Sequence, residues 1–218
     1  MTDLYEAMST LRAVRRLRPD PIPAEVLERV LQAACWAPTG GNMQPWRVIV
    51  VRSDERKAKL QAVYEPEWQN YTAANRARLE QAPLGADRDK LARTLAAGDH
   101  LAANLAQAPV ILMFCANPKF MAITDAHLDR ISMVGGGSVY TAVQNTMLAC
   151  REEGLGCTLT TLHCIQESKV LEALEIPEGW ATLAMVPIGY PVGRGHGSIT
   201  RQPPSALAFD DAFGVPWT

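Results

Sequence analysis

The segment best suited to chemistry is a loop rich in amides, glycine and proline. It reads Ala37-Pro38-Thr39-Gly40-Gly41-Asn42-Met43-Gln44-Pro45-Trp46 and lies between an expected helix and an apolar, strand-like run. Glycine lets the backbone approach a ligand closely or take a positive φ without a Cβ penalty. Asn42 and Gln44 each present a carbonyl acceptor and two N–H donors, and their spacing of two suits a planar heterocycle. Taken alone, the same residues could be only a helix stop followed by a turn.

A basic cluster precedes this loop. Arg12, Arg15, Arg16 and Arg18 place four arginines within seven residues. Such a run is usually a solvated face. The alternative is a phosphate site, because guanidinium groups bind phosphate through paired hydrogen bonds. Four side chains cannot all face one phosphate, so Arg16 and Arg18 are the ones expected at the surface.

A glycine-rich segment, Gly135-Gly136-Gly137-Ser138, superficially resembles a phosphate loop. No lysine follows it, and Tyr140 stands where a dinucleotide fingerprint would need its third glycine. We interpret it as the entry to a helix over residues 139–153, with Ser138 as N-cap. That helix is apolar on most sides, which predicts a place in the core or in a subunit interface.

Four segments in order resemble the nitroreductase superfamily of flavin-dependent oxidoreductases. They are the basic segment 10–23, the loop 37–46, the segment 154–164 and Ile188-Gly189-Tyr190-Pro191. The resemblance runs from about residue 7 to the C-terminus. It implies an α+β fold, a mixed β-sheet flanked by helices in a single domain over residues 1–218. It also implies an intertwined homodimer with FMN at the subunit interface.

The same resemblance assigns an FMN site to separated parts of the chain. The phosphate element matches Arg12 and Arg15, with Ala13 where serine is usual, so that one hydroxyl donor is lost. Arg201 matches a later basic residue that reaches the phosphate, and Arg16 is included with its segment. The remaining candidates line the flavin or face its redox edge; they are Pro38, Thr39, Gly40, Asn42, Gln44, Leu159, Thr160 and Thr161.

The implied activity passes hydride from NAD(P)H through bound FMN to an acceptor such as a nitroaromatic or a quinone. Donor and acceptor would take turns over one flavin face, with no catalytic side chain required. His163 could act as an acid, although a lone histidine in an apolar run is more often structural. Two alternatives stay open. One is a specialised relative that dehalogenates, fragments flavin or dehydrogenates a ring; the other is a flavin-binding protein without turnover, slightly favoured by Ala13.

Composition bounds the remaining possibilities. The chain has 218 residues, 48% of them hydrophobic, and a formal net charge of −2. These values indicate one globular domain and give no reason to expect a nucleic-acid partner. With no membrane-length apolar run and no visible signal peptide, we expect a cytoplasmic protein. The five cysteines are expected to be reduced and buried. The spacing of Cys157, His163 and Cys164 fits no usual zinc pattern, so no metal is expected.

Two regions are expected to complete the site. Residues 54–107 are the most polar stretch, with helical runs near 56–64 and 87–105 interrupted at Pro66 and at Pro83–Gly85. We expect a lid or substrate wall here, whose Trp68 and Tyr71 either stack on a substrate or pack the lid onto the core. The tail over residues 193–218 ends in apolar residues and is expected to wrap a partner subunit. Disorder or docking onto its own domain are its alternatives.

Overall fold

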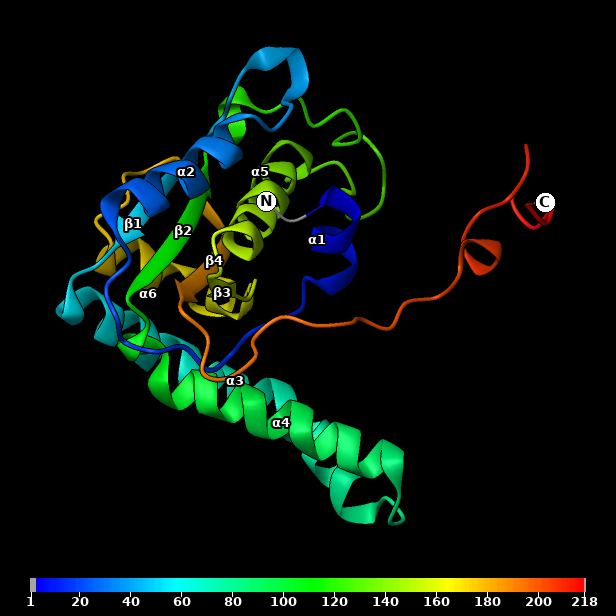
Figure 1. The fold of residues 1–218 in the computed structure, drawn as a ribbon. Coiled ribbons are helices and arrows are strands. Elements are labelled where there is room, and N and C mark those ends of the chain that lie inside the picture. The colour runs from blue at the N-terminus through cyan, green and yellow to red at the C-terminus, as the bar shows by residue number, and fades with distance from the viewer. Residues whose placement is uncertain (1–2, 218) are drawn as a thin grey trace.

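The computed structural model describes residues 3–217 and shows a β-sheet held between two layers of helices (Figure 1). The sheet has four strands in the order β1-β2-β4-β3. Each neighbouring pair is antiparallel. The α+β class is confirmed, and the described part of the sheet is antiparallel throughout. The strands are β1 Trp46–Val51, β2 Val110–Ala116, β3 Gly156–Cys157 and β4 Ala181–Gly189.

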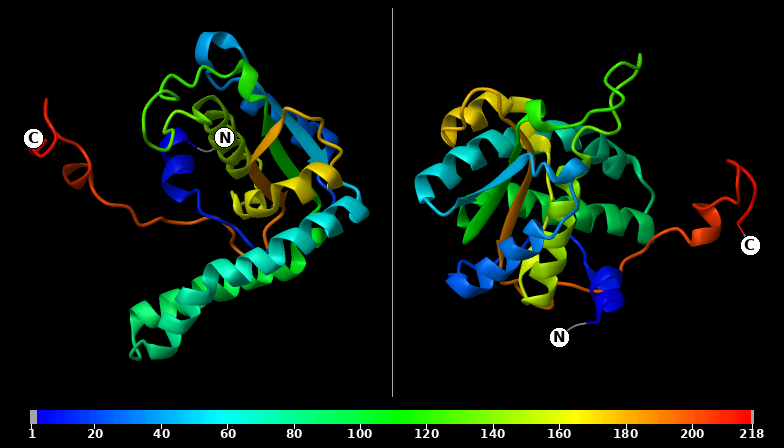
Figure 2. Two further views of the ribbon diagram at one scale, coloured as in Figure 1. Left: turned by 180° about the vertical axis from the view of Figure 1, so that it is seen from behind. Right: turned by 90° about the horizontal axis from the view of Figure 1, so that it is seen from above.

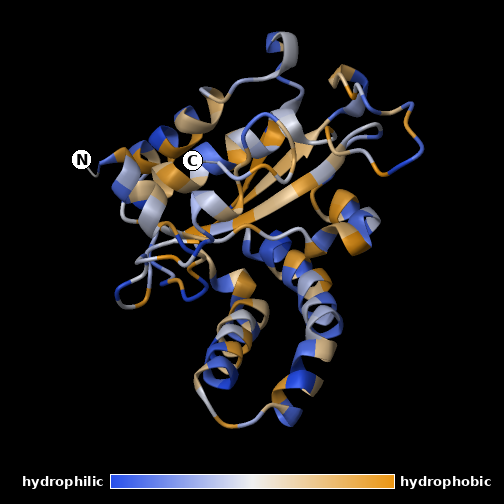
Figure 3. Ribbon diagram, turned by 90° about the vertical axis from the view of Figure 1, so that its right-hand side faces the viewer, coloured by the Kyte–Doolittle hydropathy of each residue, from blue (hydrophilic) through white to orange (hydrophobic). Residues whose placement is uncertain are grey.

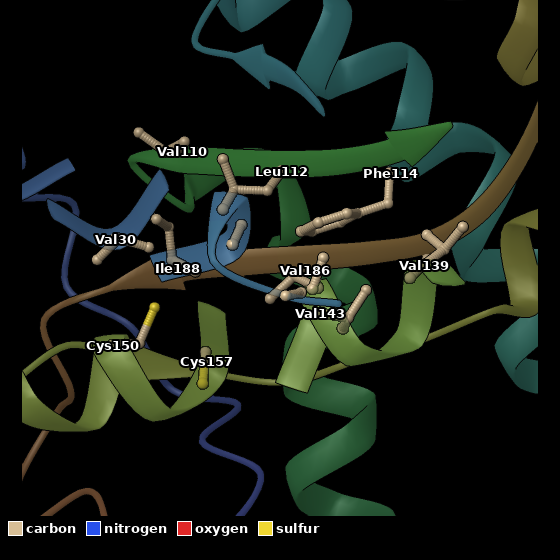
Figure 4. Close-up of a cluster of buried hydrophobic side chains, with 14 of the residues drawn as sticks. Val30, Val110, Leu112, Phe114, Val139, Val143, Cys150, Cys157, Val186 and Ile188 are labelled. Atoms are coloured by element: carbon tan, nitrogen blue, oxygen red, sulfur yellow. The ribbon is translucent and has the colours of Figure 1, made fainter. Parts of the chain in front are cut away.

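Strand β2 is buried along its whole length. Because successive strand residues point to opposite faces, its apolar run serves two cores. Leu112 and Phe114 join one cluster, in which α2 and α5 contribute (Figure 4). Ile111 and Met113 join the other, in which α3, α4 and α6 contribute. The continuous apolar sequence thus has a direct cause: helices cover both sides of this strand.

The helices fall into two groups according to the sheet face that they cover. Helices α2 and α5 lie on one face and α1 packs against α5, while α3, α4 and α6 lie on the other. Within residues 3–217, no helix is long and apolar enough to cross a bilayer. The α-helices are α1 Leu4–Thr10, α2 Ala24–Cys35, α3 Asp54–Gln81, α4 Ala86–Asn104, α5 Gly137–Glu152 and α6 Glu167–Ala173. The short 3-10 turns are η1 Gly40–Asn42, η2 Leu105–Gln107, η3 Pro118–Phe120, η4 Leu162–Gln166 and η5 Pro204–Ala206.

Helices α3 and α4 form an antiparallel hairpin that projects beyond the sheet (Figures 1 and 2). The expected interruption at Pro66 is wrong, since this proline lies inside the 28 residues of α3. Proline removes one intrahelical hydrogen bond. Here Leu60, Tyr64 and Trp68 are buried on one side of the helix, and this packing maintains the helix across the proline. Polar and apolar residues are mixed over the hairpin (Figure 3).

Trp68 joins the two helices of the hairpin. Its side chain is 9% exposed, and its indole N–H donates to Asp99 Oδ1 at 2.7 Å. Asp99 also forms an ion pair with Arg76. A Cβ atom placed on Gly98 would lie 2.0 Å from Trp68 Cζ2, so only glycine leaves room for the indole. Packing the lid, the second of the two expected roles, is therefore observed for Trp68.

This contact predicts the effect of Gly98→Ala. Alanine is the better helix former by about 1 kcal/mol, but its methyl group would collide with the indole. We expect a net loss of about 1–3 kcal/mol in the free energy of unfolding, measured with urea. The Trp68→Phe background lacks the second ring and serves as control: there the same substitution should cost clearly less. An equal cost in both backgrounds would contradict the steric explanation.

One local expectation needs correction, the N-cap of the helix after the glycine-rich segment. Helix α5 begins at Gly137 with Gly136 as its N-cap at φ 87°, so Ser138 is not the cap. The Ser138 hydroxyl accepts a hydrogen bond from Gly40 N–H at 3.2 Å instead. The segment after β3 spans residues 158–161. It contains only a single bridge between Thr160 and Met185 before η4 begins.

The chain leaves the body after Gly197, whose N–H donates to Thr10 O at 3.0 Å, and then extends into solvent (Figures 1 and 2). From Arg201 to Trp217 no side chain is buried. Phe213 is 95% exposed, and its ring centroid lies 4.7 Å from that of Phe209. For residues 201–217, docking onto their own domain, one of the alternatives, is therefore not observed. A tail with several apolar side chains in water lacks the burial that would offset its ordering entropy.

Candidate functional site

The basic segment after α1 lies along the β3 edge of the sheet. Val14 N–H donates to Cys157 O at 2.9 Å, and Val192 N–H donates to Arg16 O at 2.9 Å. Leu17 forms a bridge with Pro191. Val14 is buried whereas Arg12 and Arg16 are exposed, so the backbone is anchored while the guanidinium groups face outward. Arg18 is a surface residue, as expected, and pairs with Asp20.

A cavity of about 410 Å³, here called the arginine cavity, lies between this segment and α5. It brings together five of the candidates named from the sequence. The Arg12 Nε–H donates to Gly195 O at 2.8 Å, which orients the guanidinium. No carboxylate of residues 3–217 forms an ion pair with these arginines, which leaves their charge available to an anion. The candidates that line it are Arg12, Ala13, Arg15, Leu159 and Arg201.

A second cavity of about 260 Å³, the aromatic cavity, adjoins the first at Arg15. Thr160 and Thr161 line it, facing the hairpin aromatics Tyr64, Trp68 and Tyr71. Tyr71 is 64% exposed, so its ring is accessible to a planar ligand. Tyr64 also lines this cavity, although no local pattern around it singles it out. Burial raises the pKa of Tyr64, against the opposing effects of a hydrogen bond with Thr160 and the charge of Arg15.

The two threonines differ in their backbone groups. Thr160 N–H donates to Met185 O at 3.0 Å and is therefore occupied. The Thr161 N–H has no protein acceptor within residues 3–217. Of the two amides expected to face a flavin, the Thr161 N–H is the one free to donate.

The amide loop is held in a left-handed conformation that is uncommon for residues with side chains. Asn42 and Gln44 have φ values of 54° and 48°. Gln44 Nε2 donates to Asn42 Oδ1 at 3.2 Å, and Gln44 N–H donates to Thr39 Oγ1 at 3.1 Å. Pro38 and Gly40 attach the loop to α5, through Thr141 and Ser138. The loop is thus pre-shaped, and its amides are exposed to solvent.

The loop and the two cavities lie at opposite edges of the sheet. The loop leads directly into β1, whereas the basic segment runs beside β3, and β2 and β4 lie between them. Three strand spacings amount to about 14 Å. None of Pro38, Thr39, Gly40, Asn42 and Gln44 lines either cavity. Figure 1 shows the loop at the top of the molecule and the segment after α1 below the sheet, next to the α3–α4 hairpin. One chain therefore gathers only part of the predicted site.

His163 lies under the site and not in it. Its side chain is 1% exposed, Nε2 lies 3.5 Å from Cys164 Sγ, and it lines neither cavity. Burial lowers the pKa of His163 to about 4, with the Glu167 carboxylate opposing this shift. The imidazole is therefore neutral at neutral pH, which fits a packing role better than that of an acid.

The pKa of His163 predicts a pH-dependent stability. The unfolded chain takes up a proton below pH 6.5, whereas the folded protein does so only near 4. Stability that is present above pH 6.5 is therefore lost as the pH falls toward 4. When the pH falls from 7.5 to 5, this residue should account for a loss of about 2 kcal/mol in the free energy of unfolding. In His163→Leu, urea unfolding at the two pH values should show a loss smaller by that amount. An unchanged difference would contradict this assignment.

The cysteines only partly match their expectation. Cys115, Cys150 and Cys157 are buried, but Cys35 and Cys164 are exposed. Burial raises the pKa of the Cys115 thiol to about 12. Across residues 3–217, no three histidine, cysteine or acidic side chains gather closely enough to hold a metal ion.

The sequence profile of the Nitroreductase family matches residues 10–190, and the chain belongs to this family. It is 31% identical over 183 residues to 5,6-dimethylbenzimidazole synthase of Rhodospirillum rubrum, covering 83% of this chain and 78% of that protein. It is 29% identical over 195 residues to iodotyrosine deiodinase 1 of Rattus norvegicus, covering 87% of this chain. The matched part spans 62% of the deiodinase.

Solved structures share the fold. A putative nitroreductase of Desulfovibrio desulfuricans in complex with FMN superposes with a TM-score of 0.69 at 22% identity, covering 98% of this chain and 99% of that one. Oxidized iodotyrosine deiodinase bound to FMN and 3-iodo-L-tyrosine superposes with a TM-score of 0.68 at 23% identity, covering 92% of this chain and 96% of that one. At these identities the likeness establishes the fold and not the activity.

Proposed function

We propose that this protein is an FMN-dependent oxidoreductase that passes hydride from NAD(P)H to an acceptor such as a nitroaromatic or a quinone. The observation that carries the proposal is the arginine cavity, where three arginines without carboxylate partners among residues 3–217 meet next to a cavity lined by aromatic side chains. Membership of the Nitroreductase family supports it, as does the FMN in two structures of the same fold.

The donor set of the two cavities fits FMN. A phosphate monoester needs cations and N–H donors, which Arg12, Arg15 and Arg201 supply at the arginine cavity. Ala13 offers no hydroxyl, a loss of about 1 kcal/mol that the guanidinium groups more than offset. The ring system needs a flat, partly apolar slot, and the aromatic cavity begins at the same Arg15.

The hard chemistry belongs to the flavin, which accepts and donates hydride when bound. This chain supplies binding, orientation and electrostatics. In this proposal the Thr161 N–H, which has no protein acceptor within residues 3–217, would donate to the redox edge of the ring system. Tyr71 lines the aromatic cavity with an exposed ring; donor and acceptor would take turns there. No side chain has to move a proton in this scheme, in agreement with a buried, neutral His163.

The missing donors for the pyrimidine edge would come from a second copy of the chain. Asn42 and Gln44 are shaped and exposed, yet lie across the sheet from the arginines of the same chain. A homodimer could bring the loop of one protomer to the cavities of its partner. The extended tail, with Phe209, Phe213 and Trp217 exposed, would wrap the partner and bury its apolar side chains. We also propose that the enzyme is cytoplasmic.

The phosphate assignment can be tested by flavin retention. Arg12→Ala combined with Arg15→Ala removes two charge-assisted contacts, which should weaken FMN binding by about 100-fold or more. We expect the wild type to show flavin absorption that bleaches anaerobically with NADPH or NADH, and the double variant to lose flavin during purification. Arg18→Ala removes a neighbouring arginine that pairs with Asp20, and should retain it. A double variant that keeps its full flavin content would refute the assignment.

A specialised reaction on the same flavin is the second candidate. It is favoured by the similarity to a deiodinase and to 5,6-dimethylbenzimidazole synthase. Iodide release from 3-iodo-L-tyrosine by the reduced protein, or loss of the flavin chromophore in air, would favour it over quinone or nitroaromatic reduction. A flavin that binds but is not reduced by either nucleotide would favour the third alternative, a binding protein without turnover.

A further inference from the structure

A third cavity, about 420 Å³ in volume, opens on the other side of the basic segment and is called the basic cavity. Arg15 lines it together with the arginine and aromatic cavities, so that all three are contiguous. We propose that the basic cavity binds the 2′-phosphate of NADPH and makes the protein prefer NADPH to NADH. This inference rests on the proposed function. The cationic residues of the cavity are Arg12, Arg15, Arg16, Lys90, Arg93 and Arg194.

One wall of the basic cavity is a single face of α4. Lys90, Arg93, Thr94 and Ala97 have the spacing i, i+3, i+4 and i+7, which places them on one side of the helix. Lys90 and Arg93 border the cavity, and the small side chain of Ala97 leaves space beside them. The hairpin thus contributes cations to a cavity whose other wall belongs to a distant part of the sequence.

The opposite wall is the basic segment with the chain that follows β4. Arg16 and Val192 are joined by the backbone hydrogen bond of 2.9 Å, and Arg194 lies two residues further on. Arg16 faces α4 closely enough to affect His100 of that helix. Burial lowers the pKa of His100, and the charge of Arg16 lowers it further.

The charge of the cavity is uncompensated. Within residues 3–217, none of its six cationic side chains forms an ion pair, and no acidic residue lines it. Other arginines of the chain do have carboxylate partners, such as Arg29 with Glu153 and Arg56 with Glu175. Gathered like charges repel one another. A ligand carrying two negative charges, such as a phosphate monoester, would relieve that repulsion.

The phosphate of FMN does not account for this cavity. FMN carries one phosphate, for which the arginine cavity provides Arg201 in addition to the two shared arginines. Lys90, Arg93 and Arg194 line only the basic cavity among the three. NADPH carries a phosphate monoester at the adenosine end. With the nicotinamide in the aromatic cavity, a dinucleotide extended past Arg15 would direct that end into the basic cavity.

The experiment uses the FMN-loaded protein and the variant Lys90→Gln with Arg93→Gln. The probes are NADP⁺, which carries the 2′-phosphate monoester, and NAD⁺, which carries none; their binding is measured by calorimetry, followed by KM for NADPH and NADH. Arg78→Gln is the control, because Arg78 is an exposed arginine of the same hairpin that lies outside the basic cavity and forms no ion pair with any residue of 3–217.

We expect the wild type and Arg78→Gln to bind NADP⁺ at least about tenfold more tightly than NAD⁺. The double variant should bind NADP⁺ about tenfold or more weakly and show a KM for NADPH raised by a similar factor, with NAD⁺ binding, KM for NADH and FMN content unchanged. Equal binding of the two probes by the wild type, or an equal loss for both nucleotides, would overturn the proposal. Loss of FMN from the double variant would also overturn it and assign the cavity to the flavin phosphate. If neither nucleotide reduces the flavin while the probes are still distinguished, the proposed hydride donor fails and the anion site stands.

Discussion

Burial of β2 on both faces is the constraint on which the rest of the structure depends. All seven residues of this strand are buried, so helices must cover both sides of the sheet. Ligand-binding groups therefore have no place over the sheet centre. They occur at its two edges, with the basic segment beside β3 and the amide loop before β1. The division of the candidate site follows from this arrangement.

The hairpin of α3 and α4 links packing to chemistry. The contact between Trp68 and Gly98 holds the two helices together, and the same Trp68 lines the aromatic cavity. One face of α4 supplies Lys90 and Arg93 to the basic cavity. The hairpin thus borders both the place proposed for the nicotinamide and that proposed for the adenosine phosphate. Unpaired cations on its surface cost little in solvent, and they become favourable when an anion enters.

Much of the fold could be predicted from local patterns. Val110–Ala116 and Ala181–Gly189 are apolar runs of strand length. The end of α5 near Gly154 could be predicted too, because glycine readily takes the left-handed conformation that ends many helices. The structure confirms it, with φ 71° at Gly154. The continuation of α3 through Pro66 could not be predicted. The packing of Leu60, Tyr64 and Trp68 that maintains the helix there is a tertiary contact, which no local pattern reveals. The prediction of Ser138 as N-cap was wrong. Gly136 takes the N-cap position with a positive φ, and the Ser138 hydroxyl accepts a hydrogen bond from Gly40 N–H instead.

The site could be predicted residue by residue but not assembled. Arg12, Arg15 and Arg201 were recognisable from the family resemblance, and they do line one cavity. Tyr64 and Lys90 carried no local signal, since only the course of the hairpin brings them to Arg15. The separation of the amide loop from the arginines depends on strand order, which no spacing along the chain reveals.

The central claim is that each flavin site combines the arginines of one protomer with the amide loop of its partner. It is tested by coexpressing two differently tagged variants, Arg12→Ala with Arg15→Ala and Asn42→Ala with Gln44→Ala, and isolating the mixed dimer. Each variant alone should lack tightly bound FMN. In the mixed dimer, one site combines both defects and the other has none, so we predict about one FMN per dimer. A mixed dimer as empty of flavin as its parents would contradict a shared site and place both sets of residues within one chain.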